Sequence, residues 1–72
     1  MKIDLTSIGK RVANARKAAN MSLSDVHLAT GIAQSSICRL EHGRSVPGAI
    51  TLIILSTALG VSTDFLLGLK SQ

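Results

Sequence analysis

The sequence is poor in cysteine and in aromatic residues. Its 72 residues include one cysteine, Cys38, and one aromatic residue, Phe65. A single cysteine cannot form an internal disulfide, and small secreted domains usually need disulfides, so we expect a cytoplasmic protein. The lack of aromatics argues against single-stranded RNA binding, which stacks bases on aromatic side chains. The core must be built from Leu, Ile, Val and Ala.

Long apolar segments are also missing. The longest apolar-rich run, Ala49–Leu59, contains Thr and Ser and is about half the roughly 20 residues that a membrane span needs. The N-terminal residues lack the apolar stretch of a signal peptide. A chain this short leaves little room for an enclosed active site beside its core. We therefore expect a single domain over residues 1–72 that is neither a membrane protein nor an enzyme.

Acidic residues are outnumbered by basic residues. Eight Lys and Arg stand against four Asp and Glu, which gives a net charge of +4. An excess of positive charge on a small domain is typical of proteins with a polyanionic partner, but it also serves solubility alone. The position of the charges has to decide between these two interpretations.

Apolar residues recur at helical spacing, and no segment alternates as a half-buried strand would. Ile8, Val12, Ala15 and Ala19 are spaced by four, three and four residues, so they share one helical face. Together with capping residues and glycines, this periodicity predicts five helices, over about 6–19, 22–29, 33–42, 49–59 and 62–67. The short connections between them predict a compact all-α fold.

The segment 22–43 is organised as a helix-turn-helix. Ser22 and Asp25 match the pattern of a capping box, and Gly31 in the turn is free to take a positive φ. Val26 and Ala29 are expected on the inner face of the helix over 22–29, the first of this pair. The second helix would then expose a polar face sized for the major groove of double-stranded DNA.

Four ordered segments carry a family resemblance. They are Ile8-Gly-Lys-Arg-Val12 with Arg16-Lys17, then Thr30-Gly-Ile32, Ile37-Cys-Arg-Leu-Glu-His-Gly43 and Ala58-Leu-Gly-Val-Ser-Thr-Asp-Phe-Leu-Leu-Gly68. With these segments the chain resembles the DNA-binding domain of lambdoid phage repressors and Cro proteins (the XRE type). The resemblance implies a five-helix lambda-repressor-like fold and a sequence-specific transcriptional regulator of double-stranded DNA, with repression as the expected activity.

The resemblance assigns the recognition helix to about 33–42 and implies its DNA contacts. It places Gln34 and Ser35 where the family reads bases, with Arg39 one turn later on the same face. Gln can bond adenine and Arg can bond guanine through two hydrogen bonds, and the methyl group of Ala33 can meet a thymine methyl. Phosphate contacts are expected from the residues Lys10, Arg11, Ser22, Arg44 and Ser45.

An ion pair between Arg16 and Glu41 is also implied by the resemblance. It would connect the first helix to the end of the recognition helix. A planar guanidinium suits a two-bond contact with a carboxylate. An unpaired Glu41 on a helix that faces DNA would repel phosphate.

Three residues depart from the family pattern. Leu23 stands where a Gln commonly contacts phosphate, and an exposed Leu23 could serve a protein contact instead. His27 replaces a small residue where two helices approach closely, so its ring points to the edge or the crossing opens. A pH switch at His27 is an alternative to an ordinary half-buried histidine. Ala33 replaces a capping Ser or Thr, at a cost of about 1 kcal/mol.

The remaining residues that could form a metal or nucleophile site are one cysteine and two histidines. Cys38 and His42 are four residues apart on one helix, as metal ligands can be, but a structural zinc site needs four ligands and His27 is the only other strong candidate. We therefore expect no metal and no cofactor.

The expected partner is double-stranded DNA bound by a homodimer on a palindromic site, with half-sites about 34–36 Å apart. Ile54, Leu66 and Leu69 are candidate dimer contacts, unless they fill the core. An antitoxin or adaptor of the same fold is the alternative, binding a partner protein through Leu23, Leu28 and the apolar C-terminal region. The chain could also be the DNA-binding part of a longer repressor.

Overall fold

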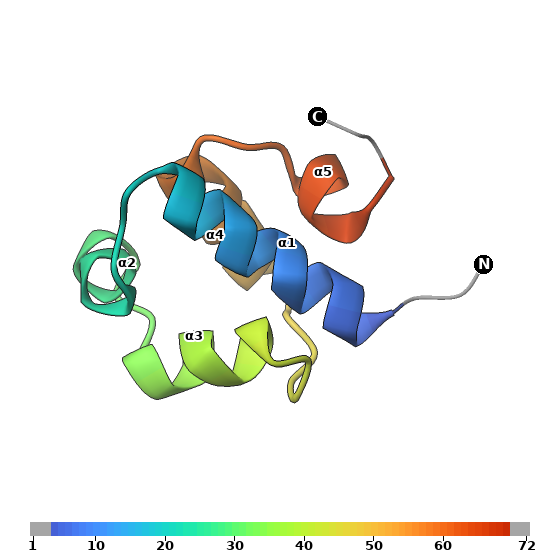
Figure 1. Cartoon of the computed structure of the whole chain (residues 1–72), viewed down its shortest axis with the longest axis horizontal. Coiled ribbons are helices and arrows are strands. Elements are labelled where there is room, and N and C mark those ends of the chain that lie inside the picture. Colours follow the sequence, from blue (N-terminus) through green and yellow to red (C-terminus); the bar gives the residue numbers. More distant parts are fainter. Residues whose placement is uncertain (1–3, 70–72) are drawn as a thin grey trace.

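The computed structural model describes residues 4–69, which fold into helices with no strand in that range (Figure 1). The five helices are α1 (Leu5–Ala18), α2 (Leu23–Thr30), α3 (Gln34–Glu41), α4 (Ala49–Leu59) and α5 (Thr63–Leu67). The all-α, five-helix fold expected from the sequence is confirmed.

The beginning of α1 is set by an acidic residue that the periodicity did not single out. The Asp4 carboxylate accepts hydrogen bonds from the backbone N–H groups of Thr6 and Ser7, at 3.0 and 3.3 Å, and from the Ser7 hydroxyl at 2.9 Å. The Ser7 hydroxyl contributes most to lowering the pKa of the Asp4 carboxyl. The helix therefore starts at Leu5, slightly earlier than expected, because Asp4 supplies the N-cap.

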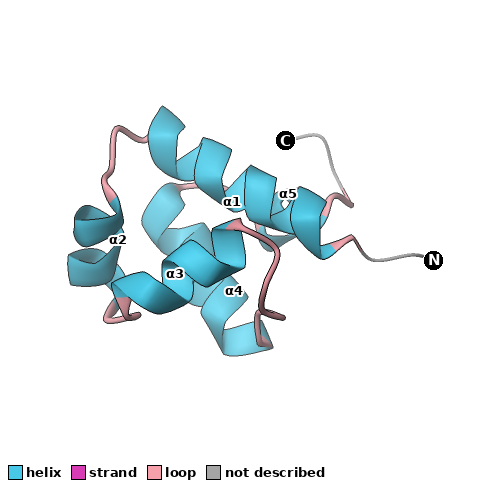
Figure 2. Ribbon diagram, turned by 60° about the horizontal axis from the view of Figure 1, so that its bottom comes forward, coloured by secondary structure: helices cyan, strands magenta, loops and turns pink. Residues whose placement is uncertain are grey.

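The core is aliphatic and is contributed by all five helices. Its buried apolar residues are Ile8, Val12, Ala15, Val26, Ile37, Leu40, Leu52, Leu55, Leu59 and Leu66. Phe65 is half-buried and packs against the core. In Figure 1, α1 crosses in front of α4 and has α3 on one side and α5 on the other, and Figure 2 shows α3 in front of α4. The central position of α1 makes it the support of α3.

Two burial expectations were wrong. Leu66 is completely buried and Ile54 is half-buried, so of the three candidate dimer contacts Leu69 alone, at 54%, is exposed, and the other two follow the core-filling alternative. Instead, the exposed large apolar residues of α4 are Ile50 and Ile53. Ala29 is exposed because the core-facing side of α2 carries Leu23 and Val26.

α1 and α3 touch at a glycine. A Cβ atom on Gly9 would lie 2.5 Å from the carbonyl oxygens of both Leu40 and Glu41, far inside a normal contact distance. Gly9 is buried, and its missing side chain lets the backbones of the two helices meet. This contact sets how close the C-terminal end of α3 lies to α1.

Candidate nucleic-acid interface

The outer face of α3 is polar and uncovered. Gln34, Ser35 and Arg39 are exposed, whereas Ile37 and Leu40 on the opposite face are buried in the core. The exposed polar face expected for this helix is therefore present. The arrangement leaves one amide, one hydroxyl and one guanidinium free to meet a partner in solvent.

α3 begins without a side-chain cap, as the sequence indicated. Its N-cap residue is Ala33, which is exposed and whose side chain makes no capping hydrogen bond. The last turn ends at His42, and Gly43 then takes a left-handed backbone with φ 71°. The uncapped end of α3 leaves the placement of its first turn to the chain that precedes it.

The turn between α2 and α3 is tightly bonded. Gly31 takes φ 77°, and its N–H donates to the His27 carbonyl at 2.8 Å. The Thr30 hydroxyl donates to the Val26 carbonyl at 2.6 Å and accepts from the N–H of Ile32 at 3.1 Å. The His27 Nδ1 lies 2.8 Å from the Ile32 carbonyl oxygen. The half-buried imidazole therefore points at the turn.

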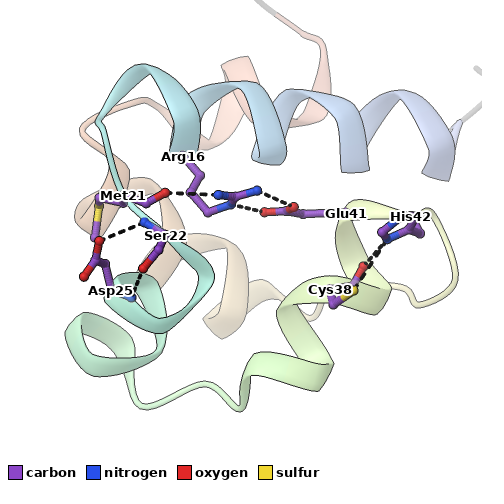
Figure 3. Close-up of polar contacts among 7 residues, drawn as sticks. All are labelled: Arg16, Met21, Ser22, Asp25, Cys38, Glu41 and His42. Carbon is purple, nitrogen blue, oxygen red and sulfur yellow. Dashed lines mark hydrogen bonds and ion pairs between the residues drawn. The ribbon is translucent and has the colours of Figure 1, made fainter.

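The ion pair expected between Arg16 and Glu41 is formed (Figure 3). Arg16 donates from Nε to Glu41 Oε2 at 2.7 Å and from Nη2 to Oε1 at 3.0 Å. Its Nη1 donates to the Met21 carbonyl at 3.0 Å. The hydrogen bonds to Glu41 raise the pKa of Arg16 above its usual value. One guanidinium thus joins α1, the α1–α2 connection and the end of α3.

The N-terminus of α2 carries the capping box that the sequence predicted. The Ser22 hydroxyl accepts from the Asp25 N–H at 3.0 Å, and the Asp25 carboxylate accepts from the Ser22 N–H at 2.8 Å (Figure 3). The bond from the Ser22 backbone lowers the pKa of Asp25 most. An ionised carboxylate therefore already holds the Ser22 N–H, and Ser22 offers a phosphate only its hydroxyl proton.

The residues expected at phosphates differ in their exposure and surroundings. Lys10 and Arg44 are exposed, and Ser45 is half-buried in the loop after α3. Arg11 is half-buried, and its guanidinium lies against Gly68, where an added Cβ would be 2.6 Å from Nη2. Gly68 ends α5, on the side of α1 away from α3 (Figure 1). Arg11 is thus placed at the negative end of the α5 dipole, apart from the α3 residues.

Cys38 and His42 do contact each other on α3. The Cys38 sulfur lies 3.7 Å from His42 Nδ1, but the same nitrogen lies 2.8 Å from the Cys38 carbonyl oxygen (Figure 3). Within residues 4–69, no group of three or more His, Cys, Asp or Glu side chains is arranged to hold a metal ion.

The two leucines considered for a protein contact differ in exposure. Leu23 is half-buried and packs against the core, so the expectation of an exposed Leu23 was wrong. Its position on the inner side of α2, three residues before Val26, accounts for this burial. Leu28 is 78% exposed on the outer side of α2.

Solved structures share this arrangement of helices. The restriction-modification controller protein C.AhdI from Aeromonas hydrophila is 25% identical, with a TM-score of 0.83 over 88% of this chain and 96% of that one. The P22 c2 repressor, solved with a synthetic operator, is 28% identical, with a TM-score of 0.78 over 83% and 91%. The biofilm master regulator SinR, solved with DNA, is 33% identical, with a TM-score of 0.80 over 83% and 97%.

No curated protein sequence matched the chain. Among the described helices, none combines the length and apolar character needed to cross a membrane. The helix-turn-helix family model matches residues 12–66, which is most of the chain. Together with the shared architecture, this match shows that the chain belongs to the lambda-repressor-like, XRE-type helix-turn-helix family of DNA-binding transcription regulators.

Proposed function

We propose that this protein is a repressor that binds a specific double-stranded DNA sequence, with α3 in the major groove. The observation that carries the proposal is the exposed polar face of α3, which is supported from behind by buried Ile37 and Leu40. The similar P22 c2 repressor and SinR were both solved with DNA, which supports the same kind of partner here. We also propose the cytoplasm as its site of action.

The proposed base contacts follow the chemistry of the exposed side chains. Gln34 reads adenine, Arg39 reads guanine, and Ser35 bonds an adjacent base edge. The Ala33 methyl meets a thymine methyl. Phosphates are bound by Lys10, Arg44, Ser45 and the Ser22 hydroxyl. Arg11 is not among these residues because its guanidinium lies against Gly68, at the end of α5.

The proposal includes a homodimer on a palindromic site. One short recognition helix spans only a few base pairs, so two copies are needed for useful specificity. The outer face of α4 is the surface we assign to this contact. Ile50 and Ile53 are 70% and 54% exposed there, and α4 contains no charged residue to repel a second positively charged copy.

The decisive experiment is selection of bound sites from a random duplex pool, followed by binding titrations across salt concentrations. We expect affinity to fall steeply with salt. Gln34→Ala should weaken the selected site by about 1–3 kcal/mol and random DNA little, whereas Arg44→Ala should weaken both similarly and reduce the salt slope by about one. Asn14→Ala, an exposed change on α1, serves as the control.

Absence of affinity for any duplex at low salt would overturn the DNA proposal. The antitoxin or adaptor role would then be preferred, and the strongly exposed Leu28 is the observation that favours it.

A further inference from the structure

The histidine in the last turn of α2 is bonded to the chain that leads into α3. His27 Nδ1 lies 2.8 Å from the carbonyl oxygen of Ile32, and the ring is half-buried. A carbonyl oxygen only accepts hydrogen bonds, so Nδ1 carries the hydrogen. In the neutral ring, Nε2 is then the unprotonated nitrogen.

Both polar groups of the Ile32 backbone are therefore held by side chains of α2. The Thr30 hydroxyl accepts from the Ile32 N–H at 3.1 Å, while His27 donates to the Ile32 carbonyl. The same hydroxyl donates to the Val26 carbonyl, which fixes its own orientation. His27 and Thr30 thus hold the carbonyl and the N–H of Ile32, and we call this arrangement the Ile32 clamp.

This clamp lies directly before the uncapped end of α3. Ala33, the residue after Ile32, makes no side-chain cap, and Gln34 and Ser35 follow at once. The first turn of α3 has no side-chain cap of its own, so its direction depends on the backbone at Ile32. A recognition group reads a base only when it is held close to its productive geometry.

We propose that His27 is a positioning residue for base recognition, which fixes the Ile32 carbonyl and thereby aims Gln34 and Ser35. The inference rests on the proposed DNA-binding function. His27 itself touches no base. Its hydrogen bond raises the affinity for the selected site, where the direction of Gln34 matters. It does not raise the affinity for random DNA, where phosphate contacts dominate.

The hydrogen bond is tested without DNA by nitrogen NMR of the two imidazoles at a pH where both are neutral, with His42→Gln used for assignment. The expected result for His27 is a protonated Nδ1 and an unprotonated Nε2. The opposite tautomer would overturn the proposal.

Its effect on recognition is tested with three variants on the selected site and on random duplex. His27→Ala should lose about three- to tenfold in affinity for the selected site and less than twofold for random DNA. His27→Asn places an amide N–H near the position of Nδ1 and should retain the preference. Thr30→Val, which keeps the shape and removes the opposite bond, should show the same selective loss as His27→Ala.

The outcomes separate this inference from the function on which it rests. A wild-type protein that shows no preference for any site would contradict the proposed function. A preference that survives in folded His27→Ala, or disappears in folded His27→Asn, would contradict the role of His27 alone. If His27→Ala does not fold, the His27→Asn variant and the tautomer decide.

Discussion

Arg16 contacts three parts of the chain with one guanidinium. Its donors reach both carboxylate oxygens of Glu41 and the Met21 carbonyl, and the Arg16 and Glu41 side chains are only 14% and 7% exposed. Because water has little access to these side chains, removing one charge leaves the other buried without a partner. The pair was predictable because both residues lie in segments that resemble the family.

We predict that Glu41→Gln lowers the free energy of unfolding by about 2–3 kcal/mol, because the Arg16 charge loses its partner. Urea unfolding followed by circular dichroism measures the change. The double variant Arg16→Met/Glu41→Gln should cost less than the two single changes added together. Strictly additive costs would show that the two side chains are not coupled.

At the scale of the helix, the distance between α1 and α3 depends on how closely their two backbones approach at a position without a side chain. Gly9 lies in the middle of α1, where glycine is unfavourable by about 1 kcal/mol relative to alanine. Glycine is nevertheless required at this position because the Leu40 and Glu41 carbonyls leave no space for a Cβ. The same close approach brings Glu41 within reach of Arg16.

Gly9→Ala should therefore destabilise the fold by about 1–3 kcal/mol, opposite in sign to its effect on helix propensity. The displaced C-terminal end of α3 should also weaken binding to the selected DNA site. Thermal and urea unfolding provide the measurement. Asn14→Ala on the exposed side of α1 is the matched control and should leave stability unchanged or slightly higher. A stabilised Gly9→Ala protein would mean that α3 is free to move away from α1.

At the scale of the whole molecule, α4 stands out because it exposes apolar side chains and carries no charge. The net charge is +4, yet no charged residue lies in α4, whose buried side carries Leu52, Leu55 and Leu59. Apolar residues occupy more than one face of α4, so packing one face into the core leaves Ile50 and Ile53 outside. An apolar surface on a basic protein is the place where two like-charged copies can meet.

We predict that Ile53→Lys reduces cooperative binding to a duplex with two half-sites, because it brings like charges together across the proposed dimer contact. Binding to a duplex with one half-site should not weaken. Titrations on the two duplexes measure the difference. Leu28→Lys makes the same change on α2 and should keep cooperativity; if only Leu28→Lys abolished it, the contact would lie on α2 instead.

The sequence alone determined the elements and most of the candidate site. Capping pairs such as Ser22 with Asp25, the left-handed Gly31 and the helical spacing of apolar residues act over a few positions, so they predict helices and the turn without a fold. The family resemblance placed Gln34 and Arg39 on the face of α3 that is uncovered. The family resemblance paired Arg16 with Glu41, a contact that joins distant positions.

Only the tertiary structure decided which apolar and basic residues face outward. Leu66 is buried and Ile53 is exposed because α4 and α5 pack on α1 at particular rotations, which local spacing does not contain. Arg11 lies against Gly68, and His27 bonds Ile32, because folding brings a helix end or a turn to each side chain. The local sequence determines which hydrogen bonds a residue can form. The way the helices cross determines which groups lie close enough to form them.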